Sequence, residues 1–300
     1  MAHRPPLTQH LKLKENVNIM GHQGHNHAAA PQGPQPLPGV AHVVAIGSGK
    51  GGVGKTTASV NLAVALAKTG YKVGLIDADI YGPNVPMMLG ATRQPNIVGD
   101  NRIEPLTAHG VKFISVGLIS PGDKPMVMRG PMLHQIIRQF LQQVEWGELD
   151  FLLVDLPPGT GDVVISLVQT VPLTGAVVVS TPSDVSLQDA RKALEMFHQV
   201  NVPVLGIIEN MSHFSCPHCH EMIDIFSTGG AERTAKQFDV PFLGSLELDP
   251  EIRAGGDTGM PVALAGPEST RAKQFYNIAR ELAEKAQQQS AKAEDVFEIS

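Results

Sequence analysis

The chain has 300 residues, of which 42% are apolar, and its 23 basic and 29 acidic residues give a formal net charge of −6. This length fills one large core or two small ones, and the negative charge offers no general attraction to nucleic acid. No apolar run approaches the roughly 20 residues that a membrane-spanning helix needs, and the N-terminus lacks the apolar core of a secretory signal. With only two cysteines, which form no disulfide framework, we expect a cytoplasmic protein that binds neither nucleic acid nor membrane.

Residues 1–39 differ in composition from the rest of the chain. A short helical segment is predicted near residues 7–19, and a stretch rich in Pro, Gly, Gln and Ala follows it. Such a composition cannot bury a core, so we expect a flexible leader. His22, His25 and His27 are either a weak transition-metal site or incidental histidines of a solvated linker.

Residues 40–289 alternate strand and helix patterns, which predicts an α/β fold with a mostly parallel sheet covered by helices on both faces. Strands are expected at 43–48, 72–77, 111–116, 151–155, 175–181, 203–209 and 242–246. Helices are expected at 55–69, 130–144, 162–170, 184–199, 229–238 and 268–288. Residues 90–128 read as a peripheral hairpin or loop excursion, and residues 290–300 as a frayed acidic tail.

A glycine-rich loop joins the first expected strand to the first expected helix. Residues 47–57 read Gly-Ser-Gly-Lys-Gly-Gly-Val-Gly-Lys-Thr-Thr, which fills every position of a phosphate-binding loop. Lys55 is expected to reach the β- and γ-phosphates of ATP, and Thr56 to bind Mg²⁺ through its hydroxyl. The expected nucleotide-binding residues are Gly49, Lys50, Gly51, Gly52, Val53, Gly54, Lys55, Thr56 and Thr57.

Carboxylates follow two of the expected strands, where a parallel sheet forms its ligand crevice. Asp79 is predicted to orient or deprotonate the attacking water. Asp77 either supports the phosphate loop or a Mg²⁺-bound water, or caps the following turn. Asp155 ends an apolar strand of Walker B form and is directed towards the metal, and the loop after it resembles a switch loop. Asp162 is interpreted as the N-cap of the next helix.

Two later residues are candidates for contacts to the nucleotide base. Asn210 follows the sixth expected strand, and its amide offers both a donor and an acceptor to a purine edge. Asp249 either flanks the same base or serves as an N-cap.

Cys216 and Cys219 are separated by two residues, a spacing that lets both thiolates bind one metal centre from a single loop. One pair supplies half of a four-coordinate site, and two subunits related by twofold symmetry supply the other half of a shared cluster. His218 or His220 completing a Zn²⁺ site is an alternative, as are a thiol–disulfide switch and inert thiols.

The lysine after Gly49 gives the loop the form Gly-Lys-Gly-Gly-Val-Gly-Lys-Thr. This form resembles the deviant Walker A class, which includes nitrogenase iron protein and the septum-positioning and chromosome-partitioning ATPases. The resemblance implies that Lys50 crosses a dimer interface to the phosphates bound by the partner. A second cation then neutralises phosphate charge only when two subunits close together.

Over residues 38–285 the chain resembles the Mrp/ApbC-type iron–sulfur cluster carrier ATPases. Beside the loop, the resemblance rests on Asp77-Ala-Asp-Ile-Tyr-Gly-Pro, Asp155-Leu-Pro-Pro-Gly-Thr-Gly-Asp, Glu209-Asn-Met-Ser and Cys216-Pro-His-Cys. It implies a homodimer with weak Mg²⁺-dependent ATPase activity, which binds a 4Fe-4S cluster between Cys216 and Cys219 of each subunit. The implied partners are cluster-assembly scaffolds and the apo iron–sulfur proteins that receive the cluster.

The sequence departs from this family in two places. A short histidine-containing leader stands where many members carry a small N-terminal domain, and His220 stands where glycine is expected. The second departure slightly strengthens the zinc alternative.

A spatial-positioning ATPase of the septum or partitioning type is the main competing function, and an ATP-using ligase or reductase is another. A positioning ATPase needs a surface anchor, and the helix expected at the C-terminus lacks the basic amphipathic face for membrane docking. No substrate-site motif supports a ligase or reductase. The cysteine pair favours the cluster carrier.

Overall fold

A computed structural model of the chain describes residues 33–80, 82–99, 101–119, 130–159 and 161–298. The helical segment expected near 7–19 and the three leader histidines lie outside these residues, as do Tyr81 and Thr160. The compact unit begins at Gly33, within the range expected for the leader. The first residues of this unit are hydrogen-bonded to the rest of it: the Gln35 N–H donates to the Thr170 carbonyl over 3.2 Å.

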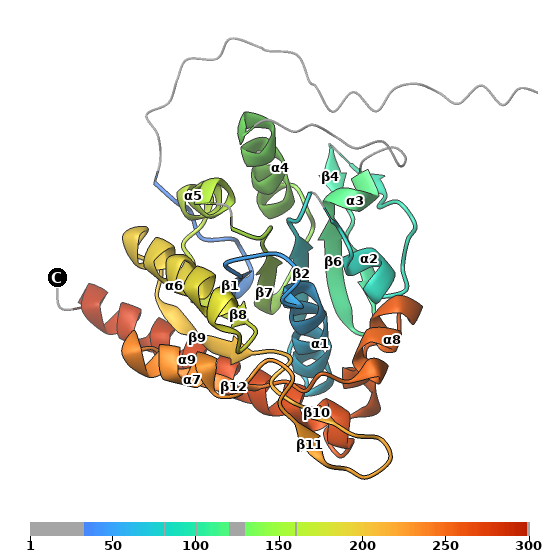
Figure 1. Cartoon of the computed structure of the whole chain (residues 1–300). Helices are drawn as coiled ribbons and strands as arrows, with labels where there is room; N and C mark the ends of the chain where they lie inside the picture. The colour runs from blue at the N-terminus through green and yellow to red at the C-terminus, as the bar shows by residue number, and fades with distance from the viewer. Residues whose placement is uncertain (1–32, 81, 100, 120–129, 160, 299–300) are drawn as a thin grey trace, which may run out of the picture. The chain divides into compact units, whose positions relative to one another are not determined.

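The strands form one large sheet and two small hairpins. The large sheet contains β1 Val40–Gly47, β2 Val73–Asp77, β5 Leu106–Ala108, β6 Val111–Ser115, β7 Leu149–Asp155, β8 Gly175–Ser180, β9 Val204–Glu209 and β12 Phe242–Ser245. The hairpins pair β3 Ile97–Val98 with β4 Arg102–Ile103, and β10 Phe214–Ser215 with β11 Met222–Ile223. The large sheet has the order β12-β9-β8-β1-β7-β2-β6-β5 (Figure 1), and β5 is its one antiparallel strand. The parallel sheet is thereby confirmed.

The helices alternate with these strands. They are α1 Lys55–Lys68, α2 Val85–Met88, α3 Val116–Ile119, α4 Gly130–Gln142, α5 Gly161–Thr170, α6 Asp184–Gln199, α7 Gly230–Gln237, α8 Pro250–Thr258 and α9 Thr270–Glu298, with a 3-10 turn at Val262–Ala265. Figure 1 shows α4 and α5 on one side of the sheet and α1 with α9 on the other. All six helices expected from the sequence are present.

The strand side chains alternate between two apolar cores. Phe151 and Leu153 of β7 pack into the core that α1 and α9 cover, whereas Leu152 and Val154 pack into the core that α4 to α7 cover. Since successive side chains of a strand point to opposite faces, a strand buried on both faces is apolar at nearly every position. This explains the unbroken apolar runs of the central strands.

The structure differs from the sequence expectations near the C-terminus. Helix α8 was not expected, because Gly255 and Gly256 lie in its interior and glycine disfavours helix. Its start signal is nevertheless complete, with Asp249 as N-cap and Pro250 in the first turn. Helix α9 continues to Glu298, beyond the expected end at 288, through strong helix formers such as Ala and Lys.

Candidate functional site

The phosphate loop connects β1 to α1 at the carboxyl end of the sheet. Gly49 lies against α6, where a Cβ atom would come within 2.1 Å of the Asp189 backbone. Gly54 has a φ of +78°, and a Cβ atom there would lie 2.1 Å from Nδ2 of Asn210. Only glycine fits either position, so packing from two sides fixes the shape of the loop.

The tip of the loop is open. Gly51 and Gly52 are exposed, and a Cβ atom added at Gly52 would meet nothing within 4 Å. Val53 is buried behind the tip, and Thr57 lies in the first turn of α1. The loop therefore leaves room beside its glycines for a bound phosphate group, as the motif predicts.

Lys55, Thr56 and Asp155 meet below the loop. Lys55 Nζ lies 2.9 Å from Asp155 Oδ2, and the two side chains are 5% and 0% exposed. The Thr56 hydroxyl donates to the same oxygen over 2.8 Å. A hydroxyl and a carboxylate oxygen are the ligands that Mg²⁺ takes in proteins, so this donor set fits the expected metal.

Ser59 is a member of this cluster that the sequence reasoning missed. Its hydroxyl donates to Asp155 Oδ1 over 2.6 Å, so that both carboxylate oxygens of Asp155 have hydroxyl donors. Ser59 lies three residues after Thr56, the spacing that places two side chains on one face of a helix. The sequence shows this spacing, but it does not show that both hydroxyls face Asp155. That contact arises because β7, which ends at Asp155, lies beside β1 in the sheet.

Asp77 anchors the turn after β2. It pairs in register with Asp155 across β2 and β7, and it accepts bonds from the Ser115 hydroxyl and from the backbone N–H groups of Asp79 and Val85. Burial, and next the negative charge of Asp155, raises the pKa of Asp77 to about 8, although these hydrogen bonds act in the opposite direction. These contacts agree with the turn-capping alternative.

Asp79 lies at the surface of the same turn. It is partly buried, and its Oδ1 accepts a bond from the Gly82 N–H over 3.3 Å. Asp79 follows the carboxyl end of β2, and Asp155 is the last residue of the parallel strand β7 beside it, so both residues lie at the same end of the sheet. Its predicted action on water stays a prediction.

The loop after β7 lies against the start of the phosphate loop. The Gly159 N–H donates to the Ser48 carbonyl over 3.1 Å, and the Ser48 hydroxyl donates to the Lys50 carbonyl over 3.0 Å. Lys50 is partly exposed there. The N-cap prediction for Asp162 is wrong, because Asp162 lies inside the first turn of α5, which begins at Gly161.

Asn210 contacts the phosphate loop directly. Its Nδ2 donates to the Val53 carbonyl over 2.8 Å, and its side chain is buried. Asp249, its proposed companion at the base, caps α8 by accepting from the Glu251 N–H over 2.8 Å and also pairs with Arg271. The N-cap interpretation of Asp249 is therefore confirmed, while the contact of Asn210 to a purine stays a prediction.

The cysteines occupy the turn of the β10–β11 hairpin, which lies at the lower edge of Figure 1. Both are free thiols; Cys219 is exposed and Cys216 partly so. Hydrogen bonds from the backbone N–H groups of Cys219 and His218 lower the pKa of Cys216. His220 has a φ of +60°, which explains why glycine would suit this position.

The zinc alternative requires His218 or His220 to lie beside the two cysteines. Within the described part of the chain, no three His, Cys, Asp or Glu side chains are grouped as a metal site. His218 and His220 therefore do not complete a site with the cysteines in this conformation.

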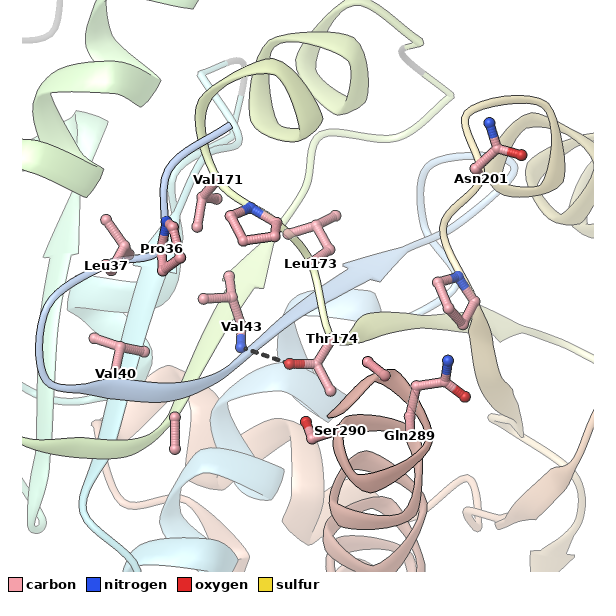
Figure 2. A pocket seen from close by; sticks show the side chains of 14 residues that line it. Pro36, Leu37, Val40, Val43, Val171, Leu173, Thr174, Asn201, Gln289 and Ser290 are labelled. Carbon is pink, nitrogen blue, oxygen red and sulfur yellow. Dashed lines mark hydrogen bonds between the residues drawn. The ribbon is translucent and has the colours of Figure 1, made fainter. Parts of the chain in front are cut away.

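A cavity of about 380 Å³ lies at the opposite end of the strands (Figure 2). It is bordered by the starts of β1 and β8 and by α9, and the Val43 N–H donates to Thr174 Oγ1 over 3.2 Å at its wall. None of the predicted site residues lines it. Among the described residues, no helix has the length and apolar character needed to cross a membrane.

Comparisons with known proteins agree with this geometry. The family model of the NUBPL iron-transfer P-loop NTPases matches residues 39–283. An "iron-sulfur cluster carrier protein" of Deinococcus radiodurans is 53% identical over 248 residues, which cover 82% of this chain and 70% of that protein.

Solved structures show the same fold. A nucleotide-binding protein of Archaeoglobus fulgidus in complex with ADP is 36% identical, with a TM-score of 0.67 over 79% of this chain and 92% of that one. The cell division ATPase MinD of Pyrococcus furiosus is 25% identical, with a TM-score of 0.62 over 81% and 99% of the two chains. The chain therefore belongs to the family of NUBPL iron-transfer P-loop NTPases.

Proposed function

We propose that this protein is an ATP-dependent iron–sulfur cluster carrier, which holds a 4Fe-4S cluster as cargo between two copies of the chain and transfers it to apo-proteins. The observation that carries the proposal is the cysteine pair on its hairpin, in which Cys219 is exposed and Cys216 partly exposed. Cys216 and Cys219 are the only cysteines of the chain, so one copy supplies two thiolates. Four thiolates are the usual ligand set of a 4Fe-4S cluster, and a twofold pair of hairpins supplies them.

The surroundings of the thiols support a contact with a second copy. Large apolar side chains are exposed on the strand after the cysteines and just beyond it, and they are Met222, Ile223, Ile225 and Phe226. Met222 is 62% exposed and Phe226 is 40% exposed. Exposed apolar groups gathered in one segment are typical of interaction sites. A symmetric contact through this segment would cover them and bring the two cysteine pairs together.

The phosphate loop supplies a weak Mg²⁺-dependent ATPase activity in this proposal. Lys55 and the loop N–H groups would bind the β- and γ-phosphates, and Thr56 and Asp155 would hold Mg²⁺, which would neutralise phosphate charge. Asp79 would orient or deprotonate the attacking water, and Lys50 would reach the phosphates bound by the other copy. Asn210 contacts the base.

The partners follow from the cargo. Cluster-assembly scaffolds would load the protein, and apo iron–sulfur proteins would receive the cluster. Free thiols in an exposed turn suit a reducing compartment, and we place the protein in the cytoplasm. Its formal charge of −6 suits protein partners rather than nucleic acid.

Anaerobic reconstitution with iron and sulfide tests the carrier function. We expect visible absorbance and about four irons per dimer, the content of one cluster with four thiolate ligands. Cys216→Ala should abolish both, whereas Ser215→Ala, at the exposed neighbouring position, should leave both unchanged. Zinc at a constant ratio that survives reconstitution, or a strictly monomeric and colourless protein, would reject the proposal.

A further inference from the structure

Two neighbouring residues after β9 both lie against the phosphate loop. Asn210 donates to the Val53 carbonyl of the phosphate loop over 2.8 Å. Met211, which follows at a φ of +57°, has its Cε 3.7 Å from the place where a Cβ of Gly54 would lie. A change in the loop around a bound phosphate therefore reaches residues 210 and 211 by direct contact.

Glu209 fastens the segment that carries the cysteines. Its carboxylate is buried at 1% exposure and accepts from the Ser212 hydroxyl over 2.7 Å, where the segment leaves the sheet. It also accepts from the Gly229 and Ala231 N–H groups over 3.0 and 2.8 Å, where the segment returns into α7. One carboxylate thus holds both ends of residues 212–229, between which the hairpin lies.

The backbone around these residues is tied to the sheet. The Asn210 N–H donates to the Ser180 carbonyl over 2.7 Å, and the Leu246 N–H donates to the Glu209 carbonyl over 2.8 Å. These bonds fix the main chain at the end of β9. The Ser212 N–H also donates to the Leu246 carbonyl over 3.0 Å, so a response to nucleotide would pass through the side chains of residues 209–212 rather than through movement of the strand.

We propose that Glu209-Asn210-Met211-Ser212 couples the nucleotide state of the phosphate loop to the conformation of the cysteine hairpin. The proposal deepens the proposed function and rests on it, because it gives the nucleotide control of the cluster-binding thiols. Nucleotide shifts the hairpin only if it binds the two arrangements with different affinity. The Asn210–Val53 bond is where such a difference would arise, since a base that reorients the Asn210 amide would change its bond to the loop carbonyl.

The cysteine content makes the coupling measurable. The chain has two cysteines, both in the hairpin, so the alkylation rate of the cluster-free protein reports on that hairpin alone. We expect saturating Mg²⁺ and a non-hydrolysable ATP analogue to change the wild-type rate at least about fivefold, the lower end for coupled sites. Glu209→Gln and Ser212→Ala should reduce this ratio to about twofold or less while nucleotide binding, measured separately, persists.

Glu232→Gln is the matched control. Glu232 is an acidic residue in the first turn of α7, next to Ala231, but its partly exposed carboxylate pairs with Lys236 at the surface. This variant should keep the wild-type ratio. Thermal unfolding of each variant identifies loss of folding, and Ser212→Ala, which removes a single hydroxyl, decides the matter if Glu209→Gln does not fold.

Two results would overturn the coupling. A wild-type rate that does not respond to nucleotide would reject it. Variants that keep the full wild-type response would also reject it, because protection would then come from subunit association alone. Neither result touches the carrier function, which iron loading of the wild-type protein decides independently.

Discussion

Removing the ammonium group of Lys55 should destabilise the nucleotide-free protein. Lys55 Nζ lies 2.9 Å from Asp155 Oδ2, and both side chains are almost completely buried. Lys55→Ala leaves a buried carboxylate without a cation, and breaking one partner of a buried pair costs about 3–5 kcal/mol. The Thr56 and Ser59 hydroxyls still donate to Asp155. We therefore expect a loss at the lower end, about 3 kcal/mol of unfolding free energy.

A double variant separates the loss of the ion pair from general disruption. Asp155→Asn added to Lys55→Ala removes the unpaired charge and should restore part of the stability, because the two residues are in contact and their effects are not additive. Lys68→Ala, at an exposed position of the same helix, should change stability by no more than about 0.5 kcal/mol.

Urea unfolding followed by tryptophan fluorescence measures these effects. Trp146 is the only tryptophan of the chain, is 3% exposed, and donates its indole N–H to the Phe140 carbonyl over 2.9 Å. A Lys55→Ala variant as stable as the wild type, or a double variant no more stable than the single one, would show that the Lys55–Asp155 pair does not stabilise the fold. In nucleotide assays, Lys55→Ala should also lose ATP binding or turnover while cluster loading stays largely intact.

Three further predictions concern neighbouring residues. Lys50→Ala should weaken ATP hydrolysis more than nucleotide affinity, because the proposed contact is made across the dimer; equal losses in turnover and binding assays would assign it a role in shaping the loop instead. The raised pKa of Asp77, about 8 against 3.8, means that the folded protein keeps a proton that the unfolded chain releases. This group therefore makes stability fall as pH rises from about 4 to 8, and Asp77→Asn should flatten that part of the urea-midpoint profile. Gly49→Ala should abolish nucleotide binding in a calorimetric titration, since its Cβ would lie 2.1 Å from the Asp189 backbone; wild-type affinity would contradict this.

The sequence predicted the sheet and the phosphate loop because their signals are local. A strand buried on both faces, a glycine-rich turn and an amphipathic helix each follow from residues that lie near one another in the chain. The contact between Ser59 and Asp155 has no such local signal, because the two residues are 96 positions apart in the chain. That contact depends on the order of β1, β7 and β2, which no short segment encodes.

Side-chain roles at strand ends were harder to predict than the strands. Asp77 and Asp79 are two residues apart, yet one is fully buried under the turn and the other lies at its surface. Asp249 and Pro250 together are typical of a helix start, but the two glycines inside α8 argue against a helix there, so the helix was not predicted. The Asn210–Val53 contact joins residues 157 positions apart, so sequence reasoning could assign Asn210 to the crevice but not to the loop carbonyl.

The phosphate loop follows the carboxyl end of β1, and the cysteine hairpin follows the carboxyl end of β9. Because these strands are parallel, both sites lie at the same end of the sheet. A second copy that docks against this edge therefore meets both sites in one contact. If ATP strengthens that contact, the two extra thiolates it brings strengthen cluster binding. Linkage then requires the converse: the cluster must raise the affinity for ATP by the same factor by which ATP raises the affinity for the cluster. Nucleotide affinity measured anaerobically with and without cluster should show this factor in wild type and lose it in Cys216→Ala. Equal affinities in the wild type would mean that the two sites close independently.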